Sequence, residues 1–116
     1  MSVMENISDV PGWLKSTTYT GKVGLTVKIY VDPAKIEAFK DLVAEHLATS
    51  LQEPGVIRFS ANRDYERDDV FWFIEEWESP SALLTHLGTE WFRGSYVVRS
   101  RELCVAPGQR ALYLMG

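Results

Sequence analysis

Two histidines and a pair of adjacent glutamates are the side chains in this 116-residue chain best suited to move a proton. The stretch VFWFIEEWESPSALLTHL, residues 70–87, places Glu75 and Glu76 next to Trp77 and carries His86 near its end. A histidine titrates near neutral pH, so His46 or His86 could serve as a general base once burial tunes its pKa. These side chains either line a reactive pocket or only form the corner between a strand and a helix.

The two glutamates do not form a paired acid and base if this stretch is a strand. Successive strand side chains point to opposite faces, so Glu75 shares a face with Trp77 while Glu76 points the other way. A carboxylate that is buried must be paired or protonated. We expect an ion pair between strands, with Arg58 as the partner of the buried glutamate.

His46 lies on the apolar side of a predicted helix. Asp32 followed by Pro33 is typical of a helix start, and the helix is expected to reach about Ser50. At 100° per residue, His46 falls in the same arc as Phe39. The imidazole therefore faces inward, either as a base in a pocket or as a core side chain hydrogen-bonded to a strand residue.

The remaining reactive side chains are weaker candidates for a catalytic or metal-binding role. His86 lies toward the edge of the apolar stripe of a second helix that begins at Ser79 and Pro80, so we expect it to be exposed or half-exposed. Cys104 lies in the apolar context ELCVA and is expected to be a small buried side chain. Two histidines and one cysteine, without HxH or HExxH spacing, predict no metal site.

The hydrophobic pattern predicts an α+β domain. Alternating or aromatic-rich stretches predict four strands, and amphipathic stretches with cap signals predict the helices between them. The expected strands are residues 24–31, 56–62, 70–77 and 109–115, and the expected helices are 32–50, 79–88 and 89–103. This order is the ferredoxin-like split βαβ arrangement, with a four-stranded antiparallel sheet whose helices cover one face.

The other face of the predicted sheet is also largely apolar and needs a cover. A two-fold homodimer is the commonest solution, so we expect a second copy there. On the second strand, Arg58 and Asn62 share one face. They are expected either to stabilise a substrate oxyanion or to meet the other subunit.

Charge and composition exclude some classes of binding partner and indicate the cellular compartment. The net charge of −4 argues against non-specific nucleic-acid binding, which needs a basic face. A lone cysteine favours a reducing compartment, and no apolar run approaches the roughly 20 residues of a membrane helix. We therefore expect a cytoplasmic protein that binds no membrane.

Residues 1–22 are turn-rich and are expected to be an extension that docks through Trp13 and Leu14, leaving a domain of residues 23–116.

The motif EPGVIRF after an amphipathic helix, followed by FIEEWESPSALLTHLGTEWF, resembles the antibiotic biosynthesis monooxygenase (ABM) family over residues 24–115. The resemblance implies a small dimeric α+β barrel. Members of this family include cofactor-free oxygenases of anthrones and quinols, haem-degrading enzymes, and an isomerase of a phosphorylated quorum-sensing sugar derivative.

The branches of the family differ in how well their residues match. Trp77 takes the place of a tryptophan of the anthrone oxygenases, but Phe73 and Leu83 stand where they have an asparagine and a tyrosine. In the haem-degrading branch, a tryptophan and the axial histidine correspond to His86 and Tyr96. In the isomerase branch, one histidine matches His86 and another lies within one residue of His46, while Trp91 replaces a third.

The resemblance implies a cofactor-independent monooxygenase that uses molecular oxygen on a small aromatic, quinol-like or polyketide-like substrate, with no bound cofactor. His46 would be the base, and Asn62 or Arg58 would stabilise the oxyanion. The expected pocket residues are Phe39, Trp72, Trp77, His86 and Tyr96. Two alternatives remain open: an isomerase or lyase that uses the same deprotonated intermediate without oxygen, and a non-catalytic module that binds a small ligand.

Overall fold

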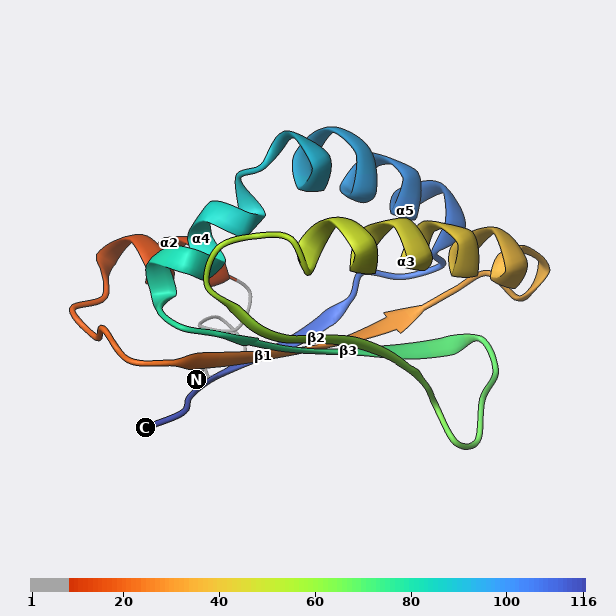
Figure 1. The fold of residues 1–116 in the computed structure, drawn as a ribbon. Coiled ribbons are helices and arrows are strands. Elements are labelled where there is room, and N and C mark those ends of the chain that lie inside the picture. The colour runs from red at the N-terminus through yellow and green to blue at the C-terminus, as the bar shows by residue number, and fades with distance from the viewer. Residues whose placement is uncertain (1–8) are drawn as a thin grey trace.

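The computed structural model describes residues 9–116 and contains one four-stranded antiparallel sheet. The strand order is β2-β3-β1-β4, and helices α3, α4 and α5 lie together on one side of the sheet (Figure 1). This arrangement confirms the ferredoxin-like α+β fold expected from the sequence. The elements are α2 (Val10–Ser16), β1 (Val23–Tyr30), η1 (Pro33–Lys35), α3 (Ile36–Ser50), β2 (Val56–Arg63), β3 (Val70–Trp77), α4 (Pro80–Leu87), η2 (Phe92–Tyr96), α5 (Val97–Leu103) and β4 (Gln109–Leu114).

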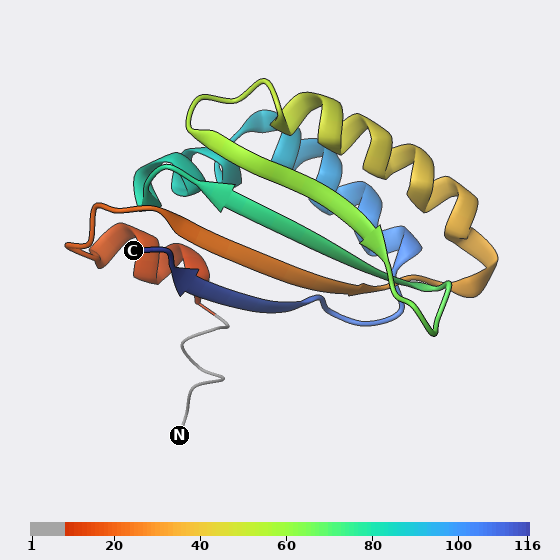
Figure 2. The ribbon, with the colours of Figure 1, turned by 60° about the horizontal axis from the view of Figure 1, so that its bottom comes forward.

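The pairing of the strands decides which side chains face the helices. In β1, Val27 lies opposite Phe73 of β3 on one side and opposite Arg110 of β4 on the other. Directly opposed residues of antiparallel strands share a face. Val27, Phe73 and Arg110 therefore point toward the helices, whereas their sequence neighbours Lys28 and Trp72 point to the opposite face. Figure 2 shows the four strands side by side.

A β-bulge interrupts the alternation of side chains at the start of β2. By strict alternation Ile57 would share a face with Phe59, but the register shifts between Val56 and Arg58. A bulge places two residues opposite one on the neighbouring strand, so the alternation is interrupted there. As a result, Val56 packs against the helix-side core, and Ile57 is 44% exposed.

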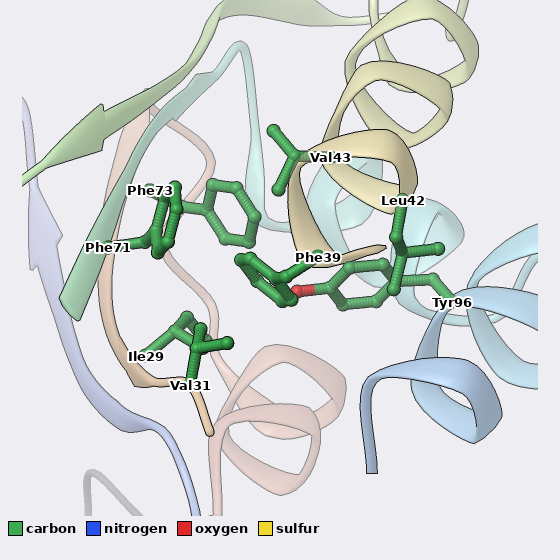
Figure 3. Packing of buried hydrophobic residues seen from close by; sticks show 8 residues of the cluster. All are labelled: Ile29, Val31, Phe39, Leu42, Val43, Phe71, Phe73 and Tyr96. Carbon is green, nitrogen blue, oxygen red and sulfur yellow. The ribbon is translucent and has the colours of Figure 1, made fainter. Parts of the chain in front are cut away.

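Helix α3 places its apolar side against the sheet as predicted. Asp32 accepts a hydrogen bond from the backbone N–H of Ala34 at 2.9 Å, which caps the 3-10 turn that leads into the helix. The buried side of α3 includes Phe39 and His46. In Figure 3, Phe39 lies among the side chains of β1, β3 and Tyr96 that form one of the two core clusters. The inward orientation predicted for His46 is confirmed, since its side chain is 1% exposed.

The segment before β1 contains a helix that the sequence pattern did not predict. Asp9 accepts a hydrogen bond from the backbone N–H of Gly12 at 3.1 Å, and Pro11 lies in the first turn, where its missing N–H costs nothing. Helix α2 packs on α4, and Leu14 is buried in the second core cluster, as expected for a docking residue. Residues 1–8 of the predicted extension lie outside the described residues.

The last helical segment is interrupted where the sequence predicted one continuous helix. Residues Phe92–Tyr96 form a π-helical turn that continues directly into α5. A π turn holds one residue more than an α-helical turn, so it rotates the side chains on its two sides relative to one another. Such turns often occur at functional sites. Here it lets Trp91 and Tyr96 both contact His46. Among the helices of residues 9–116, none is long and apolar enough to cross a membrane.

Candidate active site

A cavity of about 540 Å³ lies between the helix side of the sheet and the η2–α5 segment. Its apolar walls come from β1, Phe73, Phe92 and the loop before β4. A small number of polar side chains interrupt these walls, as in many ligand sites. They are His46, Glu75, Tyr96, Ser100, Arg101, Cys104 and Arg110.

Glu75 is a buried carboxyl in the wall of this cavity. Its side chain is 4% exposed, and the indole N–H of Trp77 donates a hydrogen bond to its Oε1 at 3.0 Å. Burial raises the pKa of Glu75 to about 7, with the negative charge of Glu53 acting in the same direction. The Trp77 hydrogen bond and the charge of Arg110 oppose this rise. A carboxyl with such a pKa can take up or release a proton near neutral pH.

The expected ion pair between strands involves the other glutamate. Arg58 lies 3.7 Å from Glu76 across the strand pair, with both side chains on the face away from the helices. The two adjacent glutamates do point to opposite faces, as predicted. No salt bridge joins Glu75 to a cation among residues 9–116. The expectation that the buried glutamate pairs with Arg58 was therefore wrong.

His46 is neutral, and one of its two ring nitrogens is already engaged. The indole N–H of Trp91 donates to His46 Nδ1 at 2.9 Å. Because Nδ1 is the acceptor, the single ring hydrogen of the neutral imidazole is on Nε2. Burial, and then the nearby charge of His86, lower the pKa of His46 to about 3. Tyr96 stacks on the ring with the centroids 3.8 Å apart, which fixes its orientation.

His86 is buried, so the expectation that it is exposed was wrong. Its side chain is 1% exposed, because α4 packs it against Trp77 with the ring centroids 4.7 Å apart. His86 Nδ1 lies 2.6 Å from Oε1 of Glu53, and Nε2 is buried without a hydrogen-bond partner among the described residues. Burial lowers the pKa of His86 even though Glu53 acts in the opposite direction.

The sequence-predicted site residues lie on two faces of the sheet. His46 and Tyr96 line the cavity, while Phe39 and Trp77 are buried in the core clusters beside it. Three others are on the opposite face, where Asn62 pairs in register with Trp72 and donates its amide N–H to the Trp72 carbonyl oxygen at 3.3 Å. The exposed side chain of Arg58 completes that group. The structure therefore does not bring Arg58, Asn62 or Trp72 to His46.

Several polar residues of the cavity were not chosen as site residues from the sequence, among them Ser100, Arg101, Cys104 and Arg110. The alternation of QRALYL places Arg110 on the same face as Leu112, which packs against the core, so this pattern could have predicted that Arg110 faces the cavity. No comparable pattern indicated that Arg101, on α5, lines the cavity. Cys104 is half-buried rather than fully buried, and burial raises the pKa of its thiol. Across residues 9–116, no three His, Cys, Asp or Glu side chains gather closely enough to hold a metal ion.

Similar folds occur among solved structures. A conserved protein from Methanosarcina mazei Go1 is 20% identical, with a TM-score of 0.78 over 84% of this chain and 95% of that chain. An antibiotic biosynthesis monooxygenase is 24% identical, with a TM-score of 0.76 over 81% of this chain and 98% of that one. A Bacteroides thetaiotaomicron protein of unknown function, described as a "possible oxidoreductase", is 27% identical, with a TM-score of 0.76 over 84% of this chain and all of that one.

The sequence itself gives the family. No curated protein matches the chain significantly. Residues 23–95 match the family model described as antibiotic biosynthesis monooxygenase, which spans more than half of the chain. This match confirms the resemblance noted in the sequence, and the chain belongs to the antibiotic biosynthesis monooxygenase family.

Proposed function

We propose that this protein is a cofactor-independent monooxygenase that acts on an aromatic, quinol-like or polyketide-like substrate. Membership of the family supports a monooxygenase-like role in general. The observation that carries the more specific proposal is Glu75, a carboxyl in an apolar cavity whose pKa burial raises to about 7. Such a group is a suitable base for a phenolic hydroxyl.

We assign the base to Glu75 and a donor role to His46. The lone pair of His46 Nδ1 is occupied by the Trp91 indole N–H, and its pKa is lowered to about 3 by burial and by His86, so the ring is a poor proton acceptor. Its Nε2–H is a hydrogen-bond donor, and His46 lines the same cavity as Glu75. A neutral donor held in an apolar site stabilises a developing oxyanion. In this proposal His46 takes the oxyanion role expected of Arg58 or Asn62.

The chemistry uses molecular oxygen as the oxidant. Glu75 removes the phenolic or enolic proton, and the resulting anion gives one electron to oxygen, forming a substrate radical and superoxide. These two combine into a carbon–oxygen bond, and the peroxide takes up a proton. Loss of water from the hydroperoxide, with the hydrogen of the same carbon, leaves a carbonyl. One oxygen atom enters the product and the other leaves as water.

The deciding experiment compares two neighbouring glutamates. Oxygen uptake and product formation are measured with a panel of air-stable quinols and anthrones, for the unmodified protein, Glu75→Gln and Glu76→Gln. Loss of a positioned general base typically costs on the order of 10²–10⁴ in rate, so we expect Glu75→Gln to lose at least about 100-fold in kcat. Glu76 is on the opposite face with Arg58, so Glu76→Gln should keep its activity. Equal activity of the two variants would contradict the assignment.

The same measurement separates the other two functions. Conversion of a substrate without oxygen uptake would favour an isomerase or lyase that uses Glu75 as its base. Tight binding of aromatic ligands with no conversion of any of them would favour a ligand-binding module.

We also propose that the protein is a homodimer joined through the sheet face away from the helices. On this face Trp72 and Ile74 are half-buried in the single chain, and Tyr113 is 40% exposed. Within residues 9–116, the helices lie on the opposite side of the sheet (Figure 1). In such a dimer, Arg58 and Asn62 would lie at the subunit contact. Sedimentation velocity at micromolar concentration should give twice the mass of one chain, and a single subunit would contradict the proposal.

A further inference from the structure

We propose that the substrate carries an acidic group, and that Arg101 and Arg110 bind this group where the cavity opens to solvent. The inference rests on the proposed function, because it takes the cavity to be the substrate site. Both arginines line the cavity and both are exposed, so each lies where the cavity reaches solvent. The buried Glu75 marks the inner end of the same cavity.

The two arginines approach the opening from different elements. Arg110 lies opposite Val27, which lies opposite Phe73, so Arg110 projects from β4 toward the helix side of the sheet. Arg101 is on α5, which covers that side. Burial is the main cause that raises the pKa of both Glu75 and Tyr96, and the charge of Arg110 opposes the rise at each group. Arg110 is thus close enough to influence the polar groups inside the cavity.

Neither arginine has a carboxylate partner among the described residues. Elsewhere in the chain, Arg58, Arg67 and Arg99 each pair with a glutamate or an aspartate. Among residues 9–116, Glu75 is the only acidic side chain that lines the cavity, and it forms no salt bridge with them. Two guanidinium groups against one carboxyl, which burial keeps partly protonated near neutral pH, give the cavity an excess of positive charge. Such a cavity concentrates anions.

The placement of the charges predicts the shape of the ligand. A guanidinium group binds a carboxylate through two parallel hydrogen bonds, so a carboxylate suits the opening. Neighbouring strands are about 4.8 Å apart, which places the backbones of β3 and β4, separated by β1, about 10 Å apart. An acidic group held near β4 would leave the far end of a rigid aromatic ring near Glu75 of β3. We therefore expect a hydroxyl and an acid at opposite ends of the ring.

A matched pair of stable ligands tests this inference without turnover. The binding of 6-hydroxy-2-naphthoate and of 2-naphthol is measured by titration calorimetry at about pH 6, below the pKa of about 7 of Glu75. The two probes share the ring and the hydroxyl and differ only in the carboxylate. One charge-assisted hydrogen bond is worth about tenfold in affinity or more, so the naphthoate should bind at least about tenfold more tightly. Its affinity should also fall as salt is added.

Single variants locate the acid site. Arg110→Gln and Arg101→Gln should each weaken naphthoate binding by about tenfold while leaving naphthol binding unchanged. Arg110→Lys should restore only part of the affinity, because an ammonium lacks the planar fork. The control is Arg93→Gln, which removes an equal charge from an exposed position of the π turn that does not line the cavity. It should bind both probes as the unmodified protein does.

The results separate this inference from the proposed function. Equal affinity for the two probes, or naphthoate binding that survives both arginine variants, would overturn the acid site. In that case oxygen uptake with uncharged quinols and its loss in Glu75→Gln would still stand. Conversely, arginine-dependent naphthoate binding with no oxygen uptake from any acidic quinol would support the acid site and count against the monooxygenase.

Discussion

Trp77 donates its indole N–H to the carboxyl of Glu75, two positions earlier on the same face of β3, at 3.0 Å. A neutral donor stabilises the carboxylate less than a guanidinium would, so burial still raises the pKa of Glu75 to about 7. The neighbouring Glu76 has the partner that Glu75 lacks, since it lies 3.7 Å from Arg58. The two adjacent glutamates thus have different partners because they lie on opposite faces of the sheet.

Removing the Trp77 donor should move the pH dependence of activity to higher pH. In the unmodified protein, kcat/KM should rise as pH increases through about 7, because the base acts when Glu75 is ionised. Trp77→Phe leaves the carboxylate without its hydrogen bond, which further raises the pKa of Glu75 by roughly one unit or more. The pH profile of kcat/KM measures this shift.

Trp72→Phe is the matched control for that experiment. The Trp72 indole donates to Asp64 at 2.9 Å on the other face of the sheet, so its removal should leave the profile in place. If Trp77→Phe and Trp72→Phe gave the same profile as the unmodified protein, the titrating group would not be Glu75.

Glu75 should make folding less favourable as pH rises. Burial raises its pKa from 4.5 to about 7, so the folded chain keeps a proton that the unfolded chain releases. The stability that this proton contributes is present below about pH 4.5 and is lost as pH increases to about 7, by about 3 kcal/mol in total. Glu75→Gln removes this dependence, so it should be more stable than the unmodified protein above pH 7.

Denaturant unfolding of the two proteins across this pH range measures the difference. His46, whose pKa burial and His86 lower to about 3, is present in both proteins, so its effect cancels in the difference. A difference that does not change between about pH 4.5 and pH 7 would show that Glu75 is ionised throughout.

Trp91 should act as a positioning residue through the tautomer of His46. Its indole N–H donates to His46 Nδ1 at 2.9 Å, which keeps the ring hydrogen on Nε2. In Trp91→Phe both neutral tautomers become accessible, so kcat should fall several-fold with little change in KM. Nitrogen chemical shifts of the imidazole should show one tautomer in the unmodified protein and a mixture in the variant. An unchanged tautomer in Trp91→Phe would contradict this role.

Helix α2 should contribute to the stability of the domain. Leu14 is 5% exposed and packs in the core cluster that also contains Trp77 and Leu83. Truncating a buried leucine costs about 2–5 kcal/mol, so Leu14→Ala should lower the free energy of unfolding by about 3 kcal/mol. The exposed neighbour Lys15 provides the control, and Lys15→Ala should change stability little. Equal stability of the two variants would mean that α2 is not part of the folded core.

Several features of the fold and the site follow from local sequence patterns. Alternating side chains predicted the strands and placed Glu75 and Glu76 on opposite faces, as the strand pairing confirms. The helical arc predicted that His46 faces inward, and the cap signals located the start of its helix. These predictions succeed because strand and helix periodicities depend only on the backbone of one element.

Other features were decided by contacts between distant parts of the chain. His86 is buried because α4 packs it against Trp77 and because the carboxyl of Glu53, 33 residues earlier, is hydrogen-bonded to its imidazole. The π turn and the bulge in β2 shift the register by one residue each and change which side chains face inward. No local periodicity contains this information.

The sequence by itself determined the four strands, the family and the inward face of the helix that carries His46. Only the tertiary structure decided which polar groups share a cavity: it places Glu75 with His46, adds Arg110 from β4, and puts Arg58 and Asn62 behind the sheet. The reason is that periodicity fixes the direction of a side chain relative to its own backbone. Which elements then lie next to one another depends on strand register and helix packing across the whole chain.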